Sequence, residues 1–188
     1  MLKGLNIVLG ITGGIAAYKA CDIISNLRKE GANVEVIMTN NATKFITPLT
    51  LMTLSNNKVI VDMFETPKNY EVEHISLAKK ADVILVAPAT ANIIGKVANG
   101  IADDMLSTTI MASKAMVVFA PAMNDQMYTN EIVQDNIKKL KEYGYEFILP
   151  IEGRLACNTK GVGKLEKPQN IVNKLKELVE GRKVWRKM

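Results

Sequence analysis

The sequence predicts an α/β fold: a doubly wound parallel sheet, Rossmann- or flavodoxin-like, with helices on both faces in a three-layer αβα arrangement. Short apolar, β-rich runs recur along the 188 residues, and segments of helical periodicity separate them. Apolar strands between helices are typical of a parallel sheet buried on both faces. With no internal repeat or linker, we expect one domain over residues 1–181 and a basic tail over residues 182–188.

The predicted elements alternate in order along the chain. Six strands are expected, at residues 5–9, 34–38, 58–62, 83–87, 116–120 and 146–149. Helices are expected at residues 14–29, 42–54, 74–80, 89–112, 124–143 and 168–180, with Gly95 and Gly100 as breaks in the fourth. A polar, glycine-punctuated loop is expected over residues 151–167. Cys21 shares the apolar face of the first helix with Ala17 and Ile24, and we expect it in the core.

The net charge of +5 is concentrated at the end of the chain, where residues 182–188 carry four basic side chains and no acid. The remaining body is close to neutral and shows no basic stripe with interleaved aromatics, so we expect no nucleic-acid partner. No apolar run approaches the roughly 20 residues of a membrane helix, and no signal peptide is visible. We therefore expect no membrane association and a cytoplasmic location.

The chain has two cysteines, Cys21 and Cys157, and a single histidine, His74. Without CxxC spacing or further histidines, these residues predict no metal site. A disulfide is not expected in a reducing compartment. Taken alone, His74 fits a surface histidine at a helix start, and Cys157 fits an unpaired thiol.

The segments that follow the strands are the candidate binding site, because ligands of open α/β sheets bind at the carboxyl ends of the strands. Residues 10–17 form a glycine-rich turn that leads into a helix of small residues. This turn can either cradle an anion or serve tight packing, and it is neither a GxGxxG motif nor a P-loop. Thr39, Asn40 and Asn41 stand where a nicotinamide-binding fold has an acidic residue, which disfavours NAD and is compatible with FMN.

Two further strand ends combine small residues with amide and hydroxyl groups. Residues 88–92 and 120–124 leave room for a flat ring and offer a few donors and acceptors to its edge. Each segment also fits a helix cap with close packing behind it. Asn124 in particular is either an N-cap or an amide ligand for a substrate.

These motifs resemble those of the homo-oligomeric flavin-containing cysteine decarboxylases, over residues 5–180. The matching residues are 13–19, His74, 88–92, 121–124 and 155–157. Within the family the chain looks most like the branch that acts on phosphopantothenoylcysteine in coenzyme A biosynthesis. The resemblance implies FMN as the cofactor, 4′-phosphopantetheine as the product, and a homo-oligomer, a trimer or a multiple of trimers, with sites between subunits.

Residue roles follow from the resemblance by position. His74 would be the catalytic histidine and Cys157 the proton donor, on a flap that covers the substrate. Asn124 would bind the substrate carboxylate, Met123 would be a second substrate-binding residue, and no metal is implied. The implied FMN contacts are Gly13, Gly14, Ile15, Thr39, Phe45, Thr47, Thr90, Ala91, Asn92, Ile93, Ser107 and Ala122.

The implied chemistry explains why a flavin is needed. Loss of CO₂ from a cysteine α-carbon leaves a poorly stabilised carbanion, and oxidation of the substrate thiol by FMN creates a C=S group that takes up its electrons. A histidine exchanges protons near neutral pH, and the cations Arg154, Lys160 and Lys164 favour a thiolate at Cys157.

The alternatives are an oxidative decarboxylase of a peptide's C-terminal cysteine, which lacks the reducing-step cysteine, and a non-catalytic flavin-binding regulatory subunit. Family members often have Gly-Asp after this cysteine, where this chain has Asn158 and Thr159. The chain ends about where bifunctional relatives begin a synthetase half, so either a stand-alone enzyme or part of a longer one is expected.

Overall fold

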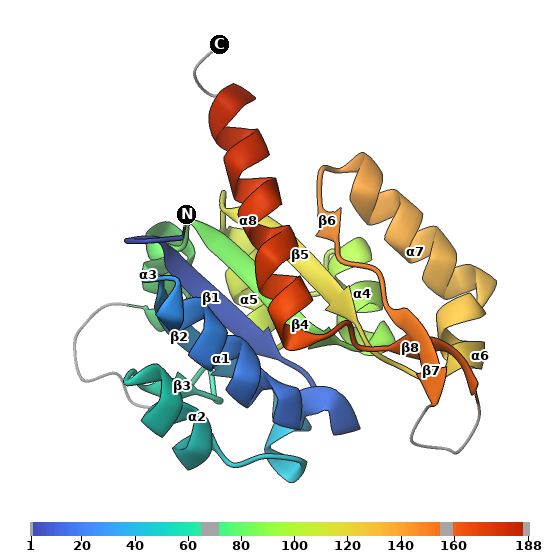
Figure 1. Cartoon of the computed structure of the whole chain (residues 1–188), viewed down its shortest axis with the longest axis horizontal. Coiled ribbons are helices and arrows are strands. Elements are labelled where there is room, and N and C mark those ends of the chain that lie inside the picture. The colour runs from blue at the N-terminus through green and yellow to red at the C-terminus, as the bar shows by residue number, and fades with distance from the viewer. Residues whose placement is uncertain (1, 65–71, 155–159, 186–188) are drawn as a thin grey trace.

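The computed structural model describes residues 2–64, 72–154 and 160–185, and it confirms the predicted doubly wound fold. Six strands form one parallel sheet in the order β3-β2-β1-β4-β5-β6 (Figure 1). These strands are β1 (Asn6–Ile11), β2 (Asn33–Met38), β3 (Val59–Ile60), β4 (Val83–Ala89), β5 (Met116–Pro121) and β6 (Glu146–Phe147). The order reverses between β1 and β4, which places the topological switch point of the sheet there.

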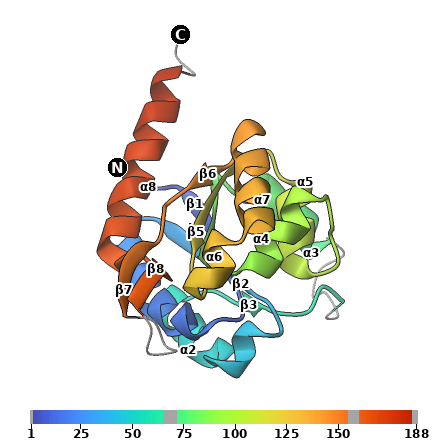
Figure 2. The ribbon, with the colours of Figure 1, turned by 90° about the vertical axis from the view of Figure 1, so that its right-hand side faces the viewer.

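Helices cover both faces of the sheet, as Figure 2 shows, with α8 on one side and α3, α4, α5 and α7 on the other. On the α8 side the chain places η1 (Ile15–Lys19), α1 (Ala20–Lys29), η2 (Ala42–Lys44), α2 (Pro48–Ser55) and α8 (Pro168–Trp185). The opposite side carries α3 (Glu73–Lys80), α4 (Ala91–Ala98), α5 (Met105–Ala112) and α7 (Glu131–Glu142). Within the described residues, no helix is both long enough and apolar enough to span a membrane.

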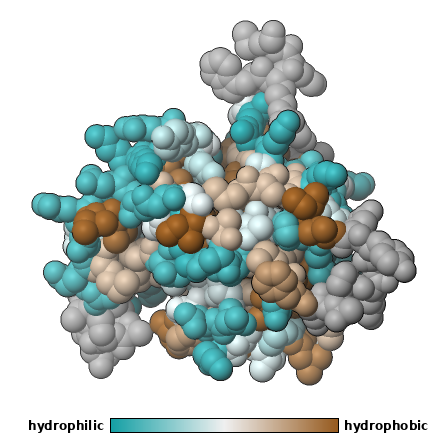
Figure 3. Space-filling model, turned by 180° about the vertical axis from the view of Figure 1, so that it is seen from behind, coloured by the Kyte–Doolittle hydropathy of each residue, from teal (hydrophilic) through white to brown (hydrophobic). Residues whose placement is uncertain are grey.

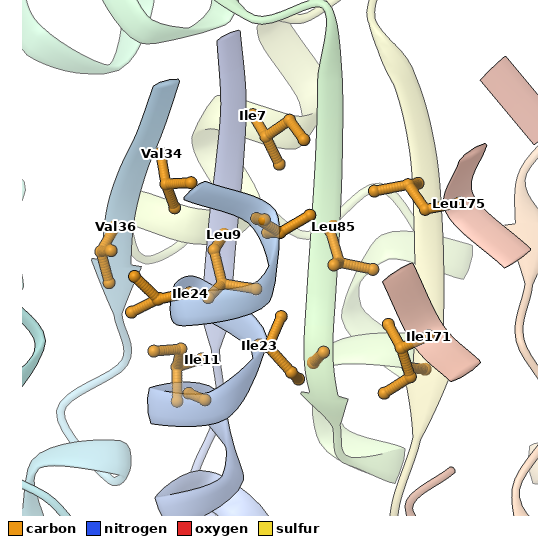
Figure 4. Close-up of a cluster of buried hydrophobic side chains, with 14 of the residues drawn as sticks. Ile7, Leu9, Ile11, Ile23, Ile24, Val34, Val36, Leu85, Ile171 and Leu175 are labelled. Carbon is orange, nitrogen blue, oxygen red and sulfur yellow. The ribbon is translucent and has the colours of Figure 1, made fainter. Parts of the chain in front are cut away.

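The core is divided into two layers by the sheet, because successive strand residues point to opposite faces. Ile7, Leu9 and Ile11 of β1 pack under α1 in one cluster that also contains Ile171 and Leu175 of α8 (Figure 4), whereas Val8 belongs to the other cluster. Burying one such side chain contributes about 1.5–3 kcal/mol. On the face opposite to Figure 1, apolar side chains at the surface are scattered among polar ones (Figure 3), as is normal for a globular surface.

Three helix predictions need correction at the level of boundaries. The helix expected over residues 124–143 is two helices, α6 (Asp125–Thr129) and α7, because Asn130 adopts an extended conformation and caps α7 by accepting from the backbone N–H of Ile132. The helix over residues 42–54 is divided because Pro48 occupies the first turn of α2, where Thr47 is the N-cap. Gly95 lies inside α4 and is no break, whereas Gly100, with φ of 70°, ends that helical segment.

The loop expected over residues 151–167 is instead an antiparallel hairpin of β7 (Ile151–Arg154) and β8 (Lys160–Lys164), which packs beside α6 (Figure 1). Glycines had indicated a loop, but in β8 they allow close approach to a neighbouring segment. The final helix also runs further than residue 180, so the first four residues of the expected basic tail are helical.

Candidate functional site

A cleft of about 610 Å³ lies where β1, β4 and β5 end, next to the switch point of the sheet. Its volume is in the usual range for a site that binds a cofactor or a small substrate. The walls come from the segments after three strands, from α6 and from the β7–β8 hairpin. The lining residues are Gly13, Gly14, Ile15, Ala16, Tyr18, Lys19, Thr90, Ala122, Met123, Asn124, Met127, Arg154, Gly163, Lys164 and Leu165.

The two glycines after β1 have different physical reasons to be glycine. A Cβ on Gly13 would lie 2.4 Å from the Cβ of Asn41, so this position is required for packing against the segment after β2. A Cβ on Gly14 would meet only the Cγ2 of Thr90, at 3.7 Å. Gly14 therefore exposes backbone to the cleft without being forced by packing. The packing interpretation of this turn holds for Gly13, and ligand binding at Gly14 stays a prediction.

Thr12 ties the ends of β1 and β4 together and was not singled out by the sequence. Its hydroxyl, 2 % exposed as a residue, donates to the carbonyl of Pro88 at 2.7 Å and accepts from the backbone N–H of Thr90 at 3.1 Å. The β1–β4 register ends at Gly10 and Val86, so this side chain continues the connection beyond the ladder. Thr12 thereby sets the spacing between the glycine turn and the start of α4.

The segment after β5 is held by the hairpin on one side and caps a helix on the other. The Asn124 Oδ1 accepts from the backbone N–H of Gln126 at 2.9 Å, which confirms the N-cap, and Asn124 also lines the cleft. The Met123 N–H donates to the Gly163 carbonyl at 3.0 Å. A Cβ on Gly163 would lie 2.3 Å from the Met123 carbonyl oxygen, so only glycine permits this contact.

Three cations, Lys19, Arg154 and Lys164, give the cleft a positive wall. Burial lowers the pKa of the Lys19 ammonium, and the like charge of Lys164 lowers it further, against the opposing effect of Asp22 and Glu166. The sequence indicated Arg154 and Lys164 only as neighbours of Cys157. A lysine at the end of η1 gives no separate signal, because its approach to the hairpin is a long-range contact.

Seven of the residues expected in the site line this cleft, and the others lie elsewhere or outside the described residues. Thr39, Phe45 and Thr47 lie on the segment around η2, while Ala91, Asn92 and Ile93 form the first turn of α4. His74 is half-buried in the first turn of α3. Cys157 falls outside the described residues. The residues that line the cleft as expected are Gly13, Gly14, Ile15, Thr90, Ala122, Met123 and Asn124.

Ser107 is fully buried and has a structural task at the start of α5. Its hydroxyl accepts from the backbone N–H groups of Asp103 and Asp104, and the Asp104 carboxylate accepts from the Ser107 N–H at 2.8 Å, which forms a capping box. Lys96 pairs with both aspartates. Burial opposes the charge of Lys96, but the two carboxylates outweigh it and raise the pKa of the ammonium.

The chemistry available in the cleft is that of hydrogen-bond donors and cations. Backbone around Gly14, the amide of Asn124 and two lysines suit a ligand that carries anionic groups. Among the residues that the structure describes, no group of three or more His, Cys, Asp or Glu side chains is placed to hold a metal ion.

Comparison with known proteins places this architecture among flavoproteins. The Flavoprotein family matches residues 1–180. The coenzyme A biosynthesis bifunctional protein CoaBC of Borreliella burgdorferi is 55 % identical over 172 residues, 92 % of this chain. The chain spans only 44 % of that relative's length. A probable phosphopantothenoylcysteine decarboxylase of Streptococcus mutans is 44 % identical over 91 % of this chain and 97 % of its own length.

Solved structures agree with this placement. The structure of a PPC decarboxylase mutant complexed with pantothenoylaminoethenethiol matches with a TM-score of 0.85 and 29 % identity, over 94 % of this chain and 98 % of that one. The FMN binding protein AtHal3 matches with a TM-score of 0.84 and 29 % identity, over 95 % of this chain and 98 % of that one.

Proposed function

Since the chain belongs to the Flavoprotein family, we propose that it binds FMN and decarboxylates 4′-phospho-N-pantothenoylcysteine to 4′-phosphopantetheine. One observation carries this proposal: a single cleft joins the glycine turn, the start of α4 and the segment of Asn124 under the β7–β8 hairpin. Two relatives that the chain covers to 97 % and 98 % of their own length carry this activity in their name.

The cleft suits a flavin on the side of the glycine turn. The open space above Gly14, the small Ala122 and the half-buried Thr90 leave room for a flat ring and a phosphate-bearing chain. When bound there, FMN supplies the reversible oxidation that makes loss of CO₂ possible. The remaining contacts proposed for the cofactor are Thr39, Phe45, Thr47, Ala91, Asn92, Ile93 and Ser107.

The chain's own residues bind the substrate and move protons. Asn124 uses its Oδ1 for the helix cap, so its side-chain orientation is set and its amide N–H₂ is the group suited to donate to a carboxylate. His74 is proposed to exchange the proton of the substrate thiol, and Cys157 to protonate the enethiolate that remains after CO₂ leaves. Met123 is proposed to contact the substrate beside Asn124.

The cysteine assignment has a direct test with a matched control. Cys157→Ser should still release CO₂ but accumulate a product two hydrogens short of 4′-phosphopantetheine, because a hydroxyl is a much weaker acid than a thiol. Mass spectrometry of a single turnover reads this difference, and Cys21→Ser, which removes the thiol packed against the core, should give the normal product. A normal product from Cys157→Ser would contradict the assignment.

The flavin itself is tested by the visible spectrum of the purified protein. Acid precipitation should release FMN into solution, because the bound cofactor is proposed to be non-covalent. A preparation that is colourless and cannot be reconstituted with FMN would contradict the proposed function.

We further propose a cytoplasmic homo-oligomer, a trimer or a multiple of trimers, with no nucleic-acid or membrane partner. Apolar side chains that line the cleft support an assembly, since Ile15, Tyr18 and Met127 are 59 %, 56 % and 49 % exposed. Light scattering should give at least three times the mass of the chain. A fully active monomer would refute this assembly.

A further inference from the structure

Two lysines line the cleft from elements that are far apart in the sequence. Lys19 ends η1, directly before α1, and Lys164 ends β8 of the hairpin. The Lys164 side chain lies along Gly153 of the neighbouring strand, where its Cδ is 3.1 Å from the position a Cβ would take. Because residue 153 is a glycine, the Lys164 side chain has room to lie across that strand.

The two ammonium groups repel each other, and both belong to the lining of one cleft. The like charge of Lys164 contributes to the lowered pKa of Lys19. Within the described part of the chain, neither lysine forms an ion pair, although Lys80, Lys96 and Lys174 all do. An anion that binds between the two would relieve this repulsion.

The nearby acids are not placed to supply that anion. Glu166 is buried, and its carboxylate accepts from the Lys167 N–H, from Asn170 and from Lys174, all at the start of α8. Asp22 is exposed on α1 and acts on Lys19 only through its field. A ligand in the cleft can therefore supply negative charge that neither of these two acids brings to the lysines.

The lysines lie apart from the glycine turn, which is the proposed position of the flavin phosphate. Five residues of 3₁₀-helix rise about 2 Å each, so Lys19 begins roughly 10 Å along η1 from the glycine turn. Backbone at that turn is available for one phosphate, and the two lysines offer a second, distinct position for an anion at the hairpin. A phosphate monoester is the chemistry that matches two convergent ammonium groups.

We propose that Lys19 and Lys164 form a subsite that binds the terminal phosphate of the substrate. This inference rests on the proposed function for the identity of the ligand. The subsite makes the β7–β8 hairpin a specificity element. Lys19 on η1 and Lys164 on β8 together let the cleft distinguish phosphorylated pantothenoyl compounds from unphosphorylated ones.

The test compares binding of two non-reacting compounds, 4′-phosphopantothenate and pantothenate, to the FMN-loaded protein by titration calorimetry. The wild type should prefer the phosphorylated compound by about 100-fold or more, and Lys19→Met and Lys164→Met should each reduce that preference about tenfold, as expected for a charge-assisted hydrogen bond. Lys164→Arg should retain most of it. Lys29→Met, which removes an exposed lysine of α1 outside the cleft, should retain all of it.

A second measurement decides whether the two lysines bind the phosphate of the substrate or that of FMN. The affinity ratio of FMN to riboflavin should be the same in the wild type and in both methionine variants. A fall in that ratio would assign the lysines to the cofactor and overturn the proposal, as would an unchanged preference for 4′-phosphopantothenate. If Lys19→Met does not fold, Lys164→Met decides, because its side chain is exposed on the hairpin.

Because calorimetry needs no turnover, this result is independent of the proposed reaction. A protein that fails to decarboxylate its proposed substrate but keeps the lysine-dependent phosphate preference would refute the reaction and support the subsite. The opposite pattern would refute the subsite alone.

Discussion

Replacing Thr12 with Val removes one hydroxyl at the switch point of the sheet and keeps the side-chain volume. Two hydrogen bonds disappear, to the Pro88 carbonyl at 2.7 Å and from the Thr90 N–H at 3.1 Å. The free energy of unfolding should fall by roughly 2–4 kcal/mol, because both hydrogen bonds are lost and the Pro88 carbonyl and the Thr90 N–H keep no partner at residue 12. For a domain of this size, such a loss lowers the melting temperature by roughly 5–15 °C.

Urea unfolding followed by circular dichroism measures the loss, and fluorescence titration of FMN measures its consequence for the cleft. Thr12→Ser keeps the hydroxyl and should recover most of the stability and of the FMN affinity. Thr109→Val makes the same exchange inside α5, where the hydroxyl only adds a second bond to the Met105 carbonyl, so it should cost less than about 1 kcal/mol and leave FMN affinity unchanged. A loss below about 0.5 kcal/mol in Thr12→Val would refute the reasoning.

Three further changes test other parts of the site. Gly163→Ala should destabilise the protein by about 1–3 kcal/mol and weaken substrate binding, because the added Cβ meets the Met123 carbonyl. The control Gly181→Ala, which adds a Cβ in open space on α8, should do neither. Equal melting temperatures of the two variants would argue against the packing role of Gly163. His74→Asn should lower turnover by ~10²–10⁴-fold with FMN affinity retained, and a loss within about tenfold in steady-state assays would return His74 to a surface role. Burial alone would raise the pKa of Glu166, but the hydrogen bonds that its carboxylate accepts from Lys167, Lys174 and Asn170 lower that pKa. The ionised carboxylate therefore stabilises the fold above the unfolded pKa of about 4.3, and this stabilisation is lost as pH falls through the folded pKa. The difference in unfolding free energy between wild type and Glu166→Gln should therefore be full at pH 7 and shrink at pH 3, and a constant difference would exclude this linkage.

Much of the fold was predictable because its signals are local. The continuous apolar run of β1 is typical of a strand buried on both faces, and Ile24 and Leu27 of α1 follow the helical period of 3.6 residues. Both signals depend only on neighbours in the chain. The boundaries failed where a single cap decided the outcome, as at Asn130, whose side chain interrupts a helical pattern that continues on both sides. The hairpin was missed for a related reason: Gly161 and Gly163 read as loop residues until their neighbours, Asp125 and Met123, are known.

For the site, the sequence by itself determined the family and the strand-end motifs, since Gly14, Thr90 and Asn124 each follow a predicted strand and parallel strands end at a common edge. Only the tertiary structure decided how these segments are held together. Thr12 meets Pro88 across 76 residues of sequence, and Lys19 reaches the field of Lys164 from a separate element. Neither pair leaves a periodic pattern in the sequence, because contacts at such separations depend on which strands are neighbours in the sheet. The alternation of strands and helices along the chain does not specify that spatial order.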